Sequence, residues 1–180
     1  MKRTTQIAVA LSLFTAPPML RAQEVSPDFA VIAGQSNAEA IPVLEQLLRN
    51  PSGASSETIV SARQALAQRA GLGSYYFGRL KTLFDADSPA ADTEMKALFR
   101  VLGTVPSNEA IMAVAEFLDA NTRRERKASN PDEETPDEAA AQTLGSLRLP
   151  DAPVRKPPTT YTAEDYAAWR EWLAACASGE

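Results

Sequence analysis

The chain contains no histidine and a single cysteine among its 180 residues. The absence of histidine excludes Ser-His and Cys-His nucleophile pairs, histidine-ligated metals and histidine-anchored haem, since each of these needs an imidazole. Cys176 has no partner for a disulfide within the chain, so the fold must be held by packing. In an exported protein an odd cysteine can pair with another chain; the alternative is a small buried side chain near a helix end.

Long apolar runs and an excess of positive charge are also missing. Beyond residue 22, no apolar run approaches the roughly 20 residues of a membrane-spanning helix. The formal charge of −5 becomes −8 when residues 1–22 are removed, because they hold three basic residues and no acidic ones. An acidic surface repels phosphates, so we expect neither a membrane span in the mature chain nor a nucleic-acid partner.

The N-terminus has the three parts of a secretory signal. Lys2 and Arg3 precede the mostly apolar stretch 7–16, and a proline pair separates that stretch from Ala22. Ten helical residues rise only about 15 Å, half of a roughly 30 Å hydrocarbon core. The segment is too short to span a bilayer, and a buried N-terminal helix is the alternative. We expect residues 1–22 to be a signal peptide cleaved near Ala22 and the mature chain to be periplasmic or secreted.

Past Val25 the composition is typical of helices, rich in Ala, Leu, Glu and Gln, with Gly and Pro mostly at segment ends. Apolar residues recur at helical spacing, Asn37 is a candidate N-cap, and Thr135–Glu138 has the spacing of a capping box. These patterns predict an all-α fold. The expected helices cover 37–49, 56–71, 75–85, 93–102, 108–120 and 136–145.

The predicted helices repeat along the chain. The triplet Glu-Ala-Ile at 39–41 recurs at 109–111, and the apolar pattern of 40–48 is echoed thirty-six residues later at 76–84. A period in the thirties with two helices per unit is typical of an α-solenoid. One helix pair cannot bury its apolar stripe alone, and about three must stack. We therefore expect a short α-solenoid of about three helix pairs.

The residues at the middle of the chain resemble a known family. Lys96–Val105, followed by Ser107–Ile111, resembles a repeat junction of HEAT-type (PBS-lyase-like) helical repeat proteins. In that family a second helix ending in Ala-Leu-Gly leads through a short turn to Glu-Ala-Ile/Val and a leucine-rich first helix. Residues 40–48, with their internal proline, resemble such a first helix, and 139–145 a second one. The resemblance implies HEAT-like pairs over 23–149, with an irregular helical bundle as the alternative.

The resemblance has two departures. Val-Arg at the start of the second helix is absent, and the charged segment 121–135 splits the third pair. After the repeats, the proline-rich segment 150–161 predicts an extended linker. A second capping-box pattern then opens a last helix over 162–178, which holds both tryptophans and places Tyr166, Trp169, Leu173 and Cys176 on one face. Aromatic stripes at helical spacing are more often core than ligand site, so we expect a C-terminal capping helix.

No catalytic, cofactor or metal-binding motif emerges from the residues. The insertion 121–135 has a basic block, containing Arg123, Arg124, Arg126 and Lys127, followed by an acidic one. The basic block is a candidate docking element for an anionic partner, and the alternative is a solvated charged loop. The acids between Asp132 and Glu138 lack the spacing and central glycine of an EF-hand, so no metal is expected.

The leading functional hypothesis is a non-catalytic protein-interaction or scaffold module without a cofactor. Stacked second helices would form one face, on which exposed Arg63, Lys96 and Arg100 would meet a partner's carboxylates or carbonyls. One alternative is a carbohydrate-binding protein or glycan-active enzyme, which a cleft with two facing acids beside a tyrosine or tryptophan would favour. Another is a structural subunit of an extracytoplasmic assembly, joined through the last helix and an intermolecular disulfide at Cys176.

Overall fold

The computed structural model describes residues 27–121, 133–157 and 159–178. Within them the secondary structure is entirely helical, which confirms the all-α prediction. The helices are α1 (Phe29–Gly34), α2 (Asn37–Arg49), α3 (Ser56–Ala67), α4 (Leu72–Ala86), α5 (Pro89–Leu102), α6 (Asn108–Asn121), α7 (Pro136–Ser146) and α8 (Ala163–Ser178). The predicted signal peptide and the basic block Arg123–Lys127 lie outside the described residues. No helix in the described residues is both long and apolar enough to cross a membrane.

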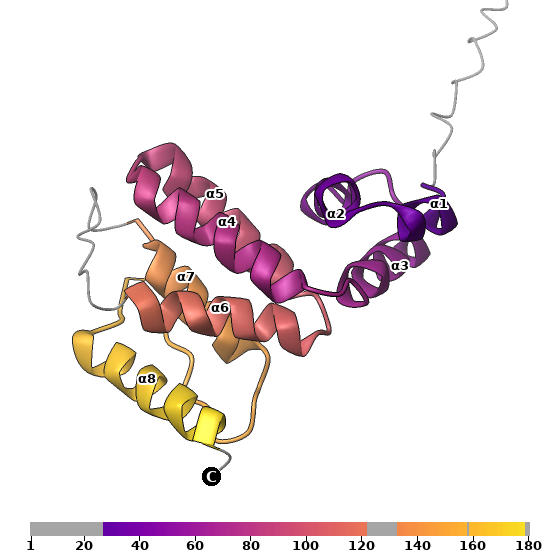
Figure 1. The fold of residues 1–180 in the computed structure, drawn as a ribbon. Coiled ribbons are helices and arrows are strands. Elements are labelled where there is room, and N and C mark those ends of the chain that lie inside the picture. Colours follow the sequence, from indigo (N-terminus) through magenta and orange to yellow (C-terminus); the bar gives the residue numbers. More distant parts are fainter. Residues whose placement is uncertain (1–26, 122–132, 158, 179–180) are drawn as a thin grey trace, which may run out of the picture.

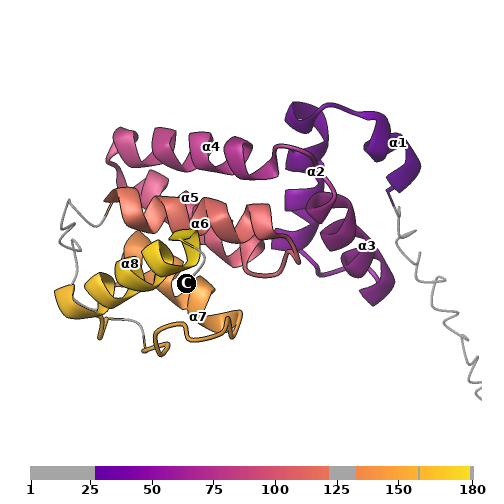
Figure 2. The same cartoon turned by 60° about the horizontal axis from the view of Figure 1, so that its bottom comes forward.

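The pairs α4–α5 and α6–α7 stack on one another. The first helices, α4 and α6, lie side by side, and so do the second helices, α5 and α7 (Figure 1). α8 then lies across α6 on the side away from α4 (Figure 2). The helices α4–α7 thus form two helix pairs packed side by side.

The first pair joins this stack differently. α2 packs on α3, but its main contact with the second pair runs to α5, and α1–α3 lie beyond one end of α4 and α5 (Figure 1). The turn between α3 and α4 passes through Gly71, whose φ of +73° is in the left-handed region that glycine adopts without strain. A continuous stack of three pairs is therefore not confirmed.

Side-chain caps explain most of the helix starts. The Thr135 backbone N–H donates to the Glu138 carboxylate (2.9 Å), and the Glu138 N–H donates to the Thr135 hydroxyl (3.2 Å), so the predicted capping box is confirmed. The predicted box at α8 is confirmed too, with Thr162 and Asp165 bonded reciprocally. At α2 the cap is Ser36, not Asn37 as predicted, because Glu39 accepts from the Ser36 N–H and hydroxyl.

Other element boundaries differ from the predictions. α1 was not predicted, since its six residues carry little periodic signal; the Asp28 carboxylate caps it. α4 begins at Leu72 and α5 at Pro89, each three or four residues earlier than expected. For α5 the reason is local: Ser88 caps the helix and proline occupies its first turn, where a missing N–H costs nothing.

One apolar core runs through the molecule. The apolar residues that recur at helical spacing along α5, namely Met95, Leu98, Phe99 and Leu102, are all buried, and Phe117 of α6 packs against Phe99 with ring centroids 4.9 Å apart. Trp169 is fully buried and anchors α8, as the capping prediction requires. Cys176, predicted on the same face, is exposed instead. Its pairing with another chain stays a prediction.

Candidate binding grooves and an ion-pair network

Where α2 meets α4 and α5, two arginines and two glutamates form a closed network. Glu45 of α2 is 3% exposed, and its two carboxylate oxygens accept from Arg49 and Arg79, each at 2.6 Å. Glu94 of α5 accepts two N–H groups of Arg49, at 2.7 and 2.9 Å, and one of Arg79. The charges balance, and every bond from Arg79 or Glu94 to α2 crosses between the first helix pair and the second.

The network changes the titration of its members. The hydrogen bonds from Arg49 hold the pKa of Glu94 below its ordinary value, against the effect of burial. Glu94 in turn raises the pKa of Arg49. The hydroxyl of Tyr76 is buried beside Glu45, and burial together with the Glu45 charge raises the pKa of Tyr76. All of these pKa shifts favour the charged forms of Glu94 and Arg49 and the neutral form of Tyr76. The network therefore serves as a structural link between the first helix pair and the second.

The structure separates the three predicted binding residues of the helices. Arg63 is half-buried on α3, which makes no extended contact with α5. The Lys96 side chain is only 12% exposed, because its ammonium binds Glu133 (2.9 Å) and the Glu134 carbonyl (3.1 Å). The expected exposure of Lys96 is therefore wrong. Arg100 is 73% exposed, and among the described residues its guanidinium forms one ion pair, with Glu134 at 3.4 Å.

Arg100 lines a groove of about 280 Å³ between α5, α7 and the proline-rich segment that begins at residue 150, hereafter the arm. The other lining residues come from the turn after α5, the segment before α7, α7 itself and the arm: Gly103, Thr104, Glu134, Ala139, Gln142, Thr143, Ser146 and Arg155. Arg155 was not among the predicted site residues. Its guanidinium donates to the Gln142 side-chain oxygen at 3.2 Å, while the Gln142 amide nitrogen is buried without an acceptor. The groove is thus richer in N–H donors than in acceptors.

Two glycines allow the walls of this groove to approach one another. A Cβ on Gly103 would lie 3.0 Å from the methyl carbon of Thr143, so α5 and α7 meet closely at this point. A Cβ on Gly145 would lie 2.8 Å from the Cβ of Arg155, closer than real side-chain carbons approach. The arm therefore rests directly on the α7 backbone, and this contact brings Arg155 to the same groove as Arg100.

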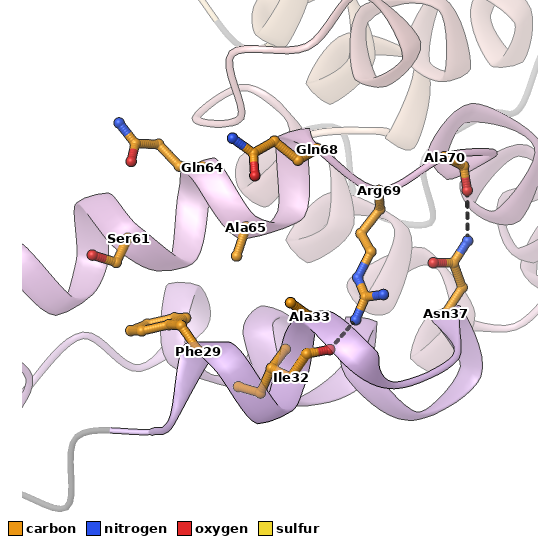
Figure 3. A pocket seen from close by; sticks show the side chains of 10 residues that line it. All are labelled: Phe29, Ile32, Ala33, Asn37, Ser61, Gln64, Ala65, Gln68, Arg69 and Ala70. Carbon is orange, nitrogen blue, oxygen red and sulfur yellow. Dashed lines mark hydrogen bonds between the residues drawn. The ribbon is translucent and has the colours of Figure 1, made fainter.

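A larger groove of about 500 Å³ lies between α1 and α3 (Figure 3). Its α3 wall carries Ser61, Gln64 and Gln68, and apolar residues of α1, including Phe29, face them (Figure 3). The one charged lining residue, Arg69, donates to the carbonyls of Ile32 (2.5 Å) and Gln35 (2.7 Å) at the C-terminal end of α1. The described residues of this lining therefore offer amides, a hydroxyl and apolar surface.

A third groove, of about 560 Å³, lies between the proline-rich arm and α8. Trp169 and Trp172 line it, and Asp151 of the arm and Glu171 of α8 contribute carboxylates from its two sides. The indole N–H of Trp172 is engaged by the Pro150 carbonyl at 3.1 Å. The Lys156 ammonium binds the Asp165 carboxylate at 2.6 Å, which helps to hold the pKa of Asp165 below its ordinary value.

The sequence held only weak signals for these sites. Arg155 sits in a proline-rich segment, and charged residues there are usually solvated. Glu45, Arg49, Arg79 and Glu94 occupy positions that read as the polar faces of amphipathic helices. Among the described residues, no three Cys, Asp or Glu side chains come together in an arrangement that would hold a metal ion.

The chain was compared with protein-family models, with curated proteins and with solved structures. None of them matches it.

Proposed function

We propose that this chain is an exported, HEAT-like helical-repeat protein that serves as a non-catalytic interaction module. The leader-like N-terminus supports export. The side-by-side packing of α4 with α6 and of α5 with α7 supports the HEAT-like reading, because stacking of like helices is how helix-pair repeats bury their stripes. The first pair departs from that stack, and the ion-pair network lies where α2 meets α4 and α5.

The observation that carries the interaction role is the open groove on the face of the second helices. α5 and α7 bury their apolar stripes against α4 and α6. Between them lies the groove lined by Arg100, whose side chain is 73% exposed. Repeat proteins bind partners on such continuous helix faces. An exposed guanidinium with one long contact keeps most of its donors available for a partner.

The test is a pull-down from the extracytoplasmic fraction with the tagged mature protein as bait. We expect a partner that is captured by the wild type and lost when Arg100 and Arg155 are both replaced by glutamine. A bait in which Lys81, an exposed residue of α4, is replaced by glutamine is the matched control. Equal capture by all three baits would show that the partner binds elsewhere on the protein, and no specific capture would contradict the interaction role.

Export is tested separately. Expression of the full chain with a C-terminal tag, followed by fractionation and N-terminal sequencing, should give a shortened chain outside the cytoplasm that begins near residue 23. A chain that retains Met1 in the cytosolic fraction would contradict the proposal of export.

A second candidate function is carbohydrate binding by the groove between the arm and α8. Trp172, a partly buried ring that lines this groove between carboxylates of the arm and of α8, favours it, since aromatic rings pack on sugar rings and carboxylates accept their hydroxyls. Titration of tryptophan fluorescence with a panel of neutral oligosaccharides tests it. Saturable quenching in the wild type that is lost in Trp172→Ala would support this function, and unchanged fluorescence would exclude it for that panel.

A further inference from the structure

We propose that the groove between α5, α7 and the arm, hereafter the arginine groove, binds a carboxylate-rich peptide segment of the partner protein. This inference rests on the proposed interaction role and names the chemistry of the occupant. Among the described residues that line the groove, Arg100 and Arg155 bring two guanidiniums, while Glu134 brings the one carboxylate. The groove is therefore locally positive on a chain whose net charge is −5.

The two guanidiniums are held loosely by the protein itself. Among the described residues, Arg100 forms one ion pair, with Glu134 at 3.4 Å, which is longer than the 2.7–2.9 Å of a strong charge-assisted hydrogen bond. Arg155 has one bond, to the neutral oxygen of Gln142, at 3.2 Å. By contrast, the arginines of the ion-pair network bind their glutamates at 2.5–2.9 Å. Arg100 and Arg155 thus retain donors that a ligand carboxylate would satisfy.

The groove is built to keep Arg155 in place. The bare backbone at Gly145 allows the arm to lie on α7, and Pro153 and Pro157 on either side of Arg155 restrict the arm's backbone. Arg155 therefore loses little backbone freedom when it binds. Preorganisation of this kind increases affinity, because less conformational entropy is lost on association.

The shape and the donors favour carboxylates on a peptide. About 280 Å³ is small for a ligand pocket, and it suits one or two inserted side chains better than a folded surface. A guanidinium forms two parallel bonds with a carboxylate, so two arginines suit two acidic side chains of one extended segment. Glu134 would lose its long contact to Arg100, and it would do so at little cost because that contact is weak.

The test uses the purified mature protein and a fluorescein-labelled hexaglutamate peptide, with a hexaglutamine peptide of equal length as the neutral probe. We expect saturable binding of hexaglutamate, seen as a rise in fluorescence polarisation, and at least tenfold weaker binding of hexaglutamine. Arg100→Gln and Arg155→Gln should each weaken hexaglutamate binding about tenfold, the loss expected for one hydrogen-bonded charge pair. Binding should also weaken as salt is raised.

Two controls keep the result interpretable. Far-ultraviolet circular dichroism establishes that each variant is folded, and Lys81→Gln removes an exposed positive charge from α4 and should leave affinity unchanged. Equal binding of the two peptides, full binding by the double arginine variant, or an equal loss in Lys81→Gln would overturn the proposal. Should the double variant still capture the cellular partner, the interaction role would stand and the arginine groove would not be its site.

Discussion

Replacing Glu45 by glutamine should remove the charge at the centre of the ion-pair network while leaving the shape of the side chain unchanged. The Glu45 side chain is 4% exposed, and each carboxylate oxygen holds one arginine N–H at 2.6 Å. Glutamine keeps one acceptor oxygen and turns an amide donor toward the other arginine. One charge-assisted bond is thus lost and the second becomes a bond to a neutral acceptor.

The magnitude follows from these contacts. A hydrogen bond to a charged group contributes about 1.5–3 kcal/mol, and removing one partner of a buried ion pair costs about 3–5 kcal/mol. We expect a value between these two ranges, because Arg49 and Arg79 are 23% and 32% exposed and both keep Glu94 as a partner. We expect the free energy of unfolding to fall by about 2–4 kcal/mol, and the melting temperature by roughly 4–16 °C for a domain of this size.

Urea denaturation followed by circular dichroism at 222 nm measures this change. Glu116→Gln, which neutralises an exposed glutamate of α6, is the matched control and should change the unfolding free energy by less than about 0.5 kcal/mol. A double-mutant cycle of Glu45→Gln with Arg79→Gln should give a coupling of about 1 kcal/mol or more. If Glu45→Gln were no more destabilising than Glu116→Gln, the network would not hold the first helix pair against the second.

Three further predictions follow from other contacts. The Arg49 guanidinium holds the pKa of Glu94 below its ordinary value of 4.5. The ionised Glu94 therefore stabilises the fold fully above pH 4.5, and this contribution is lost as the pH falls through the lower pKa of the folded state. The urea midpoint should fall more steeply with acid in the wild type than in Glu94→Gln. Gly145→Ala would place a methyl group 2.8 Å from the arm and should weaken hexaglutamate binding severalfold without removing a charge, whereas Gly78→Ala, with open space around it, should leave binding unchanged. Trp169→Ala should lower the unfolding free energy by roughly 3–5 kcal/mol, measured by urea denaturation, because the side chain is fully buried; a loss under 1 kcal/mol would show that α8 is not anchored by it.

Helix positions were predictable from sequence wherever a local signal marked an end. The boxes at Thr135 and Thr162 formed as predicted, because a cap involves residues only three apart and needs no tertiary contact. The prediction failed for α1, which is too short for a periodic pattern to emerge. It also missed the early start of α5, although Ser88 and Pro89 carry a start signal in hindsight.

The candidate sites were much less predictable. Arg100 was singled out for its place on a second helix, and it does line a groove there. Lys96, one turn earlier, looks equivalent in sequence but is occupied by Glu133 and Glu134, thirty-seven and thirty-eight residues away. Arg155 reaches the groove only because the arm folds back over Gly145. Arg100 and Arg155 are distant in sequence, so the spacing of neighbouring residues does not predict that they line one groove.

The sequence by itself determined that the chain is all helical and where most helices begin and end, since caps and apolar stripes act within a few residues. It also determined which side of α5 and α6 faces inward. The tertiary structure decided how the first helix pair meets the second. On isolated amphipathic helices, Glu45 and Arg49 are ordinary solvated charges; only the approach of α4 and α5 removes the water around Glu45 and supplies Arg79 and Glu94 as partners. A buried ion pair forms only where packing removes water from the charged groups, and the sequence of a single helix does not determine that packing.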